Sequence, residues 1–142
     1  MKTVRQLLQS KGSTVHAITP EASVFDALKL MADKNIGALL VLENGRIAGI
    51  MTERDYARKV ILLGKSSRDI PVREIMSDKV MMVQPGQTLE ECMALMTDKR
   101  VRHLPVVEGG KLVGLVSIGD LVKEVIAEQE QTIKELESYI YS

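Results

Sequence analysis

The chain contains 142 residues, of which 45% are hydrophobic and only 3% aromatic, so one compact domain or two fused half-domains can form around an aliphatic core. Its 19 Lys and Arg residues balance 19 Asp and Glu residues without long blocks of either sign, which argues against nucleic acid or an anionic membrane as a partner. The single cysteine, Cys92, excludes an internal disulfide and lies in an apolar stretch that is typical of a buried thiol.

The start of the chain, MKTVRQLLQSKG, contains no apolar run of signal-peptide length, and nowhere in the sequence do 18 apolar residues follow one another. We therefore expect a soluble, cytoplasmic protein. Within this start, VRQLL at residues 4–8 matches VREIM at residues 72–76, and we expect residues 4–8 to belong to an N-terminal helix.

A short strand and a helix are expected next. VHAIT at residues 15–19 is an apolar run stopped by Pro20, which lacks the N–H donor that a continuing ladder needs. Ser23 can cap the following helix, which we expect to end near residues 33–35. Apolar residues recur at helical spacing between these limits, at Val24, Ala27, Leu28 and Met31.

Residues 36–52, IGALLVLENGRIAGIMT, predict a β-hairpin because two β-rich runs flank the Asn44–Gly45 pair, which favours a tight turn. The hairpin leads into Thr52-Glu53-Arg54-Asp55 at the start of another helix. Strand, helix, hairpin and helix therefore follow one another within about the first half of the chain.

The same order of elements is written twice. Residues 13–61 align with residues 78–126 without a gap, at an offset of 78 − 13 = 65. The alignment predicts a strand at residues 80–84, a helix capped by Thr88, a hairpin around Gly109–Gly110 and a last helix. Identical pairs are spread along its whole length, among them Val15/Val80, Pro20/Pro85, Met31/Met96, Gly45/Gly110, Gly49/Gly114 and Asp55/Asp120.

The predicted fold class is α/β (α+β), with two β-α-β-β-α repeats, an N-terminal helix and a long C-terminal helix. One repeat has an apolar sheet face that it cannot bury alone, so two repeats are expected to pack about a pseudo-twofold axis and to leave clefts. The expected division is residues 1–67 for the first repeat with the N-terminal helix, 68–127 for the second, and 128–142 for a C-terminal helix extension.

Two compatible interpretations exist for the repeated stretches GIMTERD and GLVSIGD at residues 49–55 and 114–120. In the first, Thr or Ser caps the helix and the aspartate three residues on bonds back to the cap amide, while the glycine permits close packing. In the second, the free amides at the helix start and the hydroxyl bind a phosphate, and the aspartate binds the hydroxyls of a ribose.

These motifs together resemble a pair of CBS (cystathionine beta-synthase) domains, the tandem unit called a Bateman module. The resemblance rests on V-x-x-[IV]-x-P, a helix, [IV]-x-x-[LP]-V-V and G-hydrophobic-hydrophobic-[ST]-x-x-D, each present twice between about residues 4 and 126. It implies a stand-alone regulatory module without a catalytic cofactor. Such modules bind adenosine-containing ligands in clefts between the repeats, here AMP, ADP, ATP or NAD, with S-adenosylmethionine less expected.

Carried over residue by residue, the resemblance implies two sites. One combines Ser117 near the phosphate and Asp120 on the ribose with four residues around the base, Thr19, Ile36, Gly37 and Ala38. The other combines Thr52 and Asp55 with Gln84, Val101, Arg102 and His103. Arg54 supplies further charge for phosphates. Alternatively, Arg102 and His103 are only solvated residues at the start of a strand.

The tail after Asp120 runs without proline or glycine and predicts a helix with an apolar seam. The seam residues recur at steps of four and three, at Val122, Ile126, Gln129, Ile133, Leu136 and Ile140. We expect this helix to strengthen a homodimer, with Gln129 setting the register. The alternative is that the helix folds back on its own chain.

The leading hypothesis is a noncatalytic sensor that binds an adenine nucleotide and signals to an unknown protein partner. The alternative is a nucleotide-independent dimerisation scaffold that uses the motif only for helix capping. An enzyme is disfavoured, because the sequence offers no nucleophile and base pair and no P-loop. His16 and His103 are too few, without acids or thiols at ligand spacing, to predict a metal site.

Overall fold

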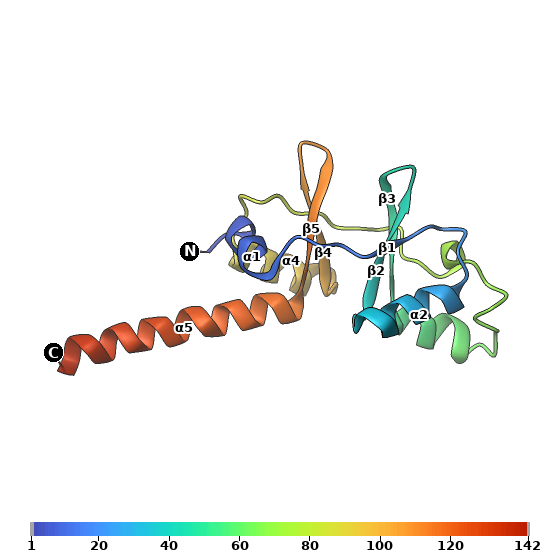
Figure 1. Ribbon diagram of the computed structural model, residues 1–142. Helices are drawn as coiled ribbons and strands as arrows, with labels where there is room; N and C mark the ends of the chain where they lie inside the picture. The colour runs from blue at the N-terminus through green and yellow to red at the C-terminus, as the bar shows by residue number, and fades with distance from the viewer. Residues whose placement is uncertain (1, 142) are drawn as a thin grey trace. The chain divides into compact units, whose positions relative to one another are not determined.

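The computed structural model describes residues 2–141, which divide into two compact units (Figure 1). The first repeat unit is Val15–Val80. The second repeat unit consists of the residues from Met81 onward together with those up to Thr14. Among residues 2–141, no helix combines the length and the apolar character that a membrane span requires.

The first repeat unit contains a three-stranded sheet and short helices. Strand β2 lies between β1, which runs parallel to it, and β3, which runs antiparallel. The helix α2 begins at its cap Ser23 and ends at Asn35, whose φ of 54° is left-handed, as expected from the sequence. The elements in chain order are β1 (Ala17–Ile18), α2 (Val24–Lys34), β2 (Ala38–Glu43), β3 (Arg46–Thr52), α3 (Glu53–Tyr56), the π-helix η1 (Ala57–Ile61) and the 3₁₀-helix η2 (Val72–Glu74).

The second repeat unit repeats this plan with a two-stranded sheet. Its strands β4 and β5 pair antiparallel, and His103 lies opposite Ser117 just as Ala38 lies opposite Thr52 in the first unit. Both turns have the positive φ angles that Asn-Gly and Gly-Gly favour, which confirms the two hairpins. The elements are α1 (Val4–Lys11), α4 (Leu89–Lys99), β4 (His103–Glu108), β5 (Lys111–Ser117) and α5 (Ile118–Tyr141).

The strand predicted at residues 80–84 is reduced to a single bridge between Val83 and Val106. In the first unit, the N–H of Leu40 donates to the carbonyl oxygen of His16 at 3.4 Å and extends the ladder. Pro105 occupies the equivalent position of β4 and has no N–H to donate. The prediction of a full strand was therefore wrong. The strand cannot extend because its partner strand β4 lacks an N–H donor at Pro105.

The N-terminal helix packs in the second repeat unit, whereas the expected division groups it with the first. The N–H of Val4 donates to the carbonyl oxygen of Gln87 at 2.9 Å, and the N–H of Val72 donates to that of Ala22 at 2.8 Å. Residues 4–8 and 72–76, which match in sequence, thus make equivalent contacts with different repeats. Each repeat unit therefore packs with a segment that lies outside the stretch expected for it from the order of the sequence.

The glycines of the repeated motif allow these segments to approach. A Cβ atom at Gly49 would lie 2.6 Å from the backbone oxygen of Ser77, and one at Gly114 would lie 2.7 Å from a methyl carbon of Leu8. Both distances are shorter than a real Cβ contact. Gly49 is therefore required for packing, because a backbone atom cannot move aside, whereas a side chain at position 114 would displace the Leu8 methyl groups. Their packing role, one of the expected interpretations, is confirmed.

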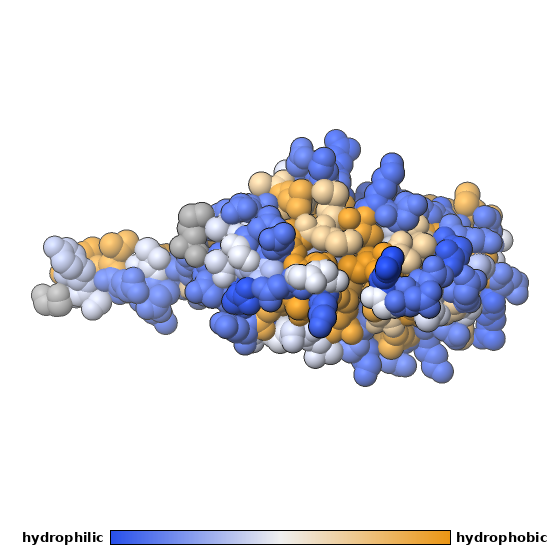
Figure 2. Space-filling model, turned by 90° about the horizontal axis from the view of Figure 1, so that it is seen from above, coloured by the Kyte–Doolittle hydropathy of each residue, from blue (hydrophilic) through white to orange (hydrophobic). Residues whose placement is uncertain are grey.

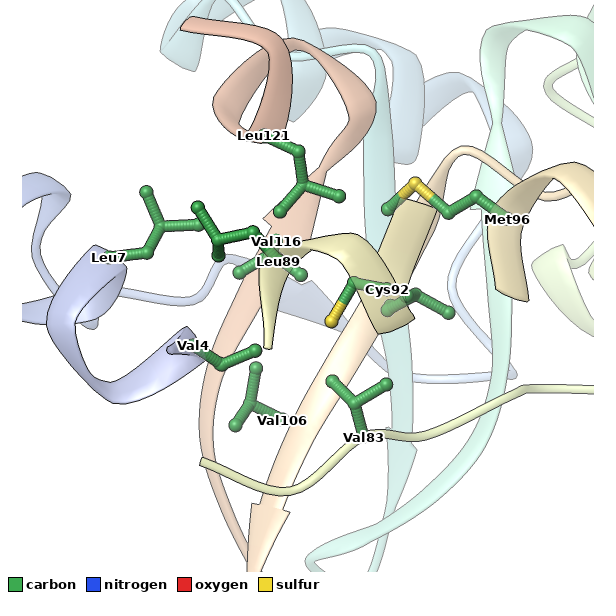
Figure 3. Close-up of a cluster of buried hydrophobic side chains, with 10 residues drawn as sticks. Val4, Leu7, Val83, Leu89, Cys92, Met96, Val106, Val116 and Leu121 are labelled. Carbon is green, nitrogen blue, oxygen red and sulfur yellow. The ribbon is translucent and has the colours of Figure 1, made fainter. Parts of the chain in front are cut away.

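Each unit has its own aliphatic core. In the second unit, side chains from α1, α4, both strands and α5 point toward one another (Figure 3). Val4, Leu89, Leu104 and Leu121 are completely buried there. Cys92 is also buried in this core, and burial, with a smaller contribution from the charge of Glu91, raises the pKa of its thiol to about 11. The thiol is therefore protonated at neutral pH and serves as a small apolar side chain.

Candidate functional site

The repeated hydroxyl and acid motif of the second unit forms a reciprocal cap at the start of α5. The N–H of Ser117 donates to Oδ2 of Asp120 at 2.9 Å, and the N–H of Asp120 donates to Oγ of Ser117 at 3.1 Å. The capping-box prediction is confirmed by this geometry. The remaining amides of the first turn and the positive end of the helix dipole create a place that favours an anion.

Lys11, in the last turn of α1, adds a cation to this motif. Its Nζ donates to Oδ2 of Asp120 at 2.7 Å and to the carbonyl oxygen of Leu115 at 2.7 Å. The side chain of Asp120 remains 26% exposed, so it is partly accessible to a ligand. The second unit thus combines a carboxylate, a hydroxyl and an ammonium group around one helix end.

The pKa of Asp120 is lowered by these partners. Burial alone raises the pKa, but the hydrogen bond from Lys11, the hydrogen bonds from Ser117 and the positive charge of Lys11 outweigh it. The carboxylate is consequently ionised at neutral pH and can accept two hydrogen bonds from a vicinal diol, such as a ribose carries.

His103 and Arg102 lie at the start of β4, next to the same helix end. His103 pairs with Ser117 across the two strands, and the carbonyl oxygen of Arg102 accepts from the N–H of Ile118 at 2.9 Å. The pKa of His103 is lowered mainly by burial, with Lys11 and Arg102 adding to the decrease and Asp120 opposing it. The neutral imidazole can therefore donate or accept a hydrogen bond at pH 7.

Replacement of His103 by glutamine is expected to reduce the loss of folding stability below pH 6.5. The unfolded chain protonates a histidine at a pKa of about 6.5, whereas the folded chain protonates His103 only at lower pH. The unfolded state thus binds more protons in this window, and stability falls as the pH drops from about 6.5 through the folded pKa. Urea unfolding of wild type and His103→Gln from about pH 5 to pH 7 measures the difference.

His16→Gln is the matched control for that measurement, because His16 is the other histidine of the chain. It is expected to retain the decrease in stability seen in the wild type. Equal slopes for wild type and His103→Gln would contradict the role assigned to the buried imidazole.

The motif of the first unit forms the same cap with a different cation. The N–H of Thr52 donates to Oδ2 of Asp55 at 3.0 Å, and the N–H of Asp55 donates to Oγ1 of Thr52 at 3.2 Å. Nζ of Lys59 lies 3.3 Å from Oδ1 of Asp55 and also donates to the carbonyl oxygen of Ile75 at 2.9 Å. Arg54 is exposed within the motif.

The residues expected around the base are partly brought together in the first unit. Ala38 pairs with Thr52, and the carbonyl oxygen of Gly37 accepts from the N–H of Glu53 at 3.1 Å. An open cavity of about 560 Å³ is lined by α2 and α3 and includes Ile36 and Gly37. Thr19 is exposed immediately after β1. The start of the β2–β3 hairpin and the start of α3 therefore lie at the same end of the first unit.

Gln84 and Val101 occupy loops of the second unit. The N–H of Gln84 is bonded to the side chain of Gln87 at 2.8 Å, and the N–H of Val101 donates to the carbonyl oxygen of Met96 at 3.1 Å. Neither contact assigns a binding role to these two residues. Their place in a ligand site remains a prediction.

Two cations beside the acids were not among the expected site residues. Lys59 could have been found from its i, i+4 spacing to Asp55, which places both side chains on one helix face. Lys11 lies 109 residues from Asp120, so no local spacing connects them. Among residues 2–141, no group of three or more His, Cys, Asp or Glu side chains could hold a metal ion.

Comparison with known proteins agrees with this geometry. The CBS domain family model matches residues 5–61 and 72–127. The chain is 40% identical over 147 residues to a mitochondrial CBS domain-containing protein of Arabidopsis thaliana, covering 97% of this chain and 71% of that protein.

Solved structures give the same result. A protein with CBS domains from Burkholderia ambifaria has 59% identity and a TM-score of 0.87, covering 90% of this chain and 96% of that one. At 21% identity and a TM-score of 0.75, the fold also matches the CBS domain pair of protein MJ0100, solved with methylthioadenosine and S-adenosyl-L-methionine; that match covers 90% of this chain and 98% of that one. With two family matches along its length, the chain belongs to the CBS domain family as a tandem pair.

Proposed function

We propose that this CBS domain pair is a noncatalytic regulatory module that binds an adenosine-containing nucleotide and signals to a protein partner. The observation that carries the proposal is the ionised, partly exposed Asp120 at the start of α5, with Ser117 and Lys11 within hydrogen-bonding distance. A carboxylate suits the ribose hydroxyls, and the helix end suits a phosphate. The solved CBS pair of MJ0100 supports an adenosyl ligand as the class.

The proposed ligand-binding residues are the two groups that the family resemblance implies. One group is Ser117 and Asp120, for the ribose and phosphate, with Thr19, Ile36, Gly37 and Ala38 for the base. In the other, Thr52, Arg54 and Asp55 act with Gln84, Val101, Arg102 and His103. Because the second group carries more positive charge, the two sites are expected to differ in affinity.

The cations near the motifs favour phosphate-bearing ligands. Lys11, Arg54 and Arg102 attract the phosphates of AMP, ADP, ATP or NAD, whereas the sulfonium of S-adenosylmethionine gains nothing from them. A ribose at Asp120 has to share the carboxylate with Lys11 or displace it. A phosphate group can pair with the ammonium group of a displaced Lys11. This pairing further favours a nucleotide over S-adenosylmethionine.

Calorimetric titration of the purified chain with AMP, ATP, NAD and S-adenosylmethionine tests the proposal. We expect saturable binding of at least one phosphate-bearing adenosyl compound, with GTP and inorganic phosphate as controls for base and charge. Absence of both heat and thermal stabilisation for every adenosyl compound would overturn it. Incubation of the same compounds with the protein checks for turnover, which is not expected.

A nucleotide-independent scaffold is the second candidate function. It is favoured by the two capping boxes, because Asp55 and Asp120 both have hydrogen-bond and ion-pair partners within the chain. In that case the carboxylates contribute only to helix stability. The same titration distinguishes the two functions, since a scaffold binds none of the nucleotides.

A further inference from the structure

Helix α5 continues beyond the residues that it packs against in its own unit. Leu121 is buried, and Glu124 pairs with Lys2 of the N-terminal segment at 2.5 Å. From Gln129 to Tyr141 every residue is exposed. Figure 1 shows this part of α5 extending away from α1 and α4. About three helical turns are therefore exposed to solvent within their unit.

This projecting part, together with the helical turn before it, carries a narrow apolar stripe. The exposed fractions are 49% for Ile126, 54% for Ile133, 57% for Leu136 and 70% for Ile140. Figure 2 shows hydrophobic side chains between hydrophilic ones on the projecting end. The spacing of four and three residues places them on one seam of two apolar positions per heptad. Such a seam is narrower than the face that a helix turns toward a globular core.

The seam has the composition of a two-stranded coiled coil. Ile126, Ile133 and Ile140 occupy successive a positions, and the d positions are held by Val122, Gln129 and Leu136. β-branched residues at a with leucine at d favour parallel dimers over higher oligomers. A helix of this length is marginally stable alone in water, so pairing with an identical helix stabilises it. A second copy of this chain is therefore the occupant that fits the seam.

Gln129 determines the orientation of the two helices. In a parallel pair, Gln129 faces Gln129 of the second copy, and the two amides can bond to each other. In the antiparallel pair that aligns the whole seam, Gln129 faces Ile133 of the second copy. Its amide then lies in an apolar layer without a partner, which is unfavourable.

The charges beside the seam support the parallel orientation. In a parallel pair, Glu130 lies next to Val125 of the second copy, and Glu137 lies next to Thr132, so like charges do not meet. In the antiparallel pair, Glu130 lies next to Glu130 of the second copy, and the two carboxylates repel each other.

We propose that residues 122–141 of α5 form a parallel two-stranded coiled coil with the same segment of a second copy of this chain. The interface holds two CBS pairs side by side in the same direction. It is independent of nucleotide binding and lies on residues that the ligand proposal does not use.

Cysteine cross-linking of the full chain carrying Ile140→Cys tests the orientation. A parallel pair places the two introduced thiols across one a layer, within the separation that a disulfide spans. An antiparallel pair places Ile140 opposite Val122, so the two thiols lie 140 − 122 = 18 residues apart, about 27 Å along the helix. We expect a disulfide-linked dimer on mild oxidation of Ile140→Cys and none from wild type, because Cys92 is buried.

Two further variants control for random collision. Ile133→Glu in the Ile140→Cys background places a carboxylate in the seam and is expected to reduce the cross-linked fraction at least tenfold at low protein concentration. Gln131→Glu in the same background adds the same charge on the helix face opposite the seam and is expected to leave the fraction unchanged. All variants change exposed residues, and circular dichroism confirms their folding.

Absence of a cross-link in folded Ile140→Cys would overturn the proposal. So would a cross-link that persists fully with Ile133→Glu, because it then forms by collision rather than through the seam. The experiment contains no nucleotide, so its failure leaves the proposed ligand binding unaffected, and a failed titration leaves the coiled coil unaffected.

Discussion

Replacement of Asp120 by alanine is expected to weaken nucleotide binding ten- to hundredfold. The variant removes a charged hydrogen-bond acceptor for the ribose, an interaction worth roughly 1.5 to 3 kcal/mol. The carboxylate is ionised in the free protein, because Lys11 and Ser117 hold its pKa below the ordinary value against the effect of burial. Calorimetric titration of wild type and Asp120→Ala with the tightest adenosyl ligand measures the loss.

The matched control is Asp78→Ala, which removes an exposed aspartate that is not among the proposed ligand-binding residues. It is expected to bind as the wild type does. Loss of thermal stability in Asp120→Ala with unchanged affinity would instead show that the carboxylate only caps α5. Asp55→Ala provides the equivalent measurement for the first repeat.

Replacement of Leu7 by alanine is expected to lower the free energy of unfolding by about 2 to 5 kcal/mol, as is typical for a buried leucine. Leu7 is 2% exposed and lies in the core of the second repeat unit with Leu89 and Leu121 (Figure 3). Although α1 precedes the first repeat in the sequence, the loss of stability should be largest in the second repeat unit. Hydrogen exchange should show greater loss of protection in α4, β4 and β5 than in β2 and β3.

Two variants make this expectation specific. Ile75→Ala removes the residue that corresponds to Leu7 in the other repeat, where it is 3% exposed, and should weaken protection in β2 and β3 instead. Gln9→Ala changes an exposed residue of α1 and should have little effect. Equal loss of protection in both units for Leu7→Ala would contradict the assignment of α1 to the second core.

The local structure of the chain was largely predictable because local residues determine it. Asn44–Gly45 and Gly109–Gly110 adopt the positive φ angles of the tight turns, so both hairpins form as expected. Thr52 and Ser117 each cap a helix with the aspartate three residues on. Tandem repetition itself is visible in the sequence, and it led to the family that the comparisons show.

The candidate site was only partly predictable. The hydroxyls and acids were found because a motif repeats them, and their reciprocal hydrogen bonds are present in both repeats. Lys11 was not found, since its contact with Asp120 depends on where α1 packs. The reduced strand at residues 80–84 was missed for a similar reason, because Pro105 removes a donor from the neighbouring strand.

The turns, the helix caps and the apolar seam of α5 follow from the sequence because each depends on residues that are close together along the chain. The repeat is also visible in the sequence, by aligning the chain with itself. Tertiary packing, by contrast, determines which repeat unit residues 4–8 and 72–76 join and brings Lys11 to Asp120. Those contacts depend on the space left by Gly49 and Gly114, into which segments distant in sequence pack. Because these contacts are made by close packing between segments that are distant along the chain, no local sequence pattern predicts them.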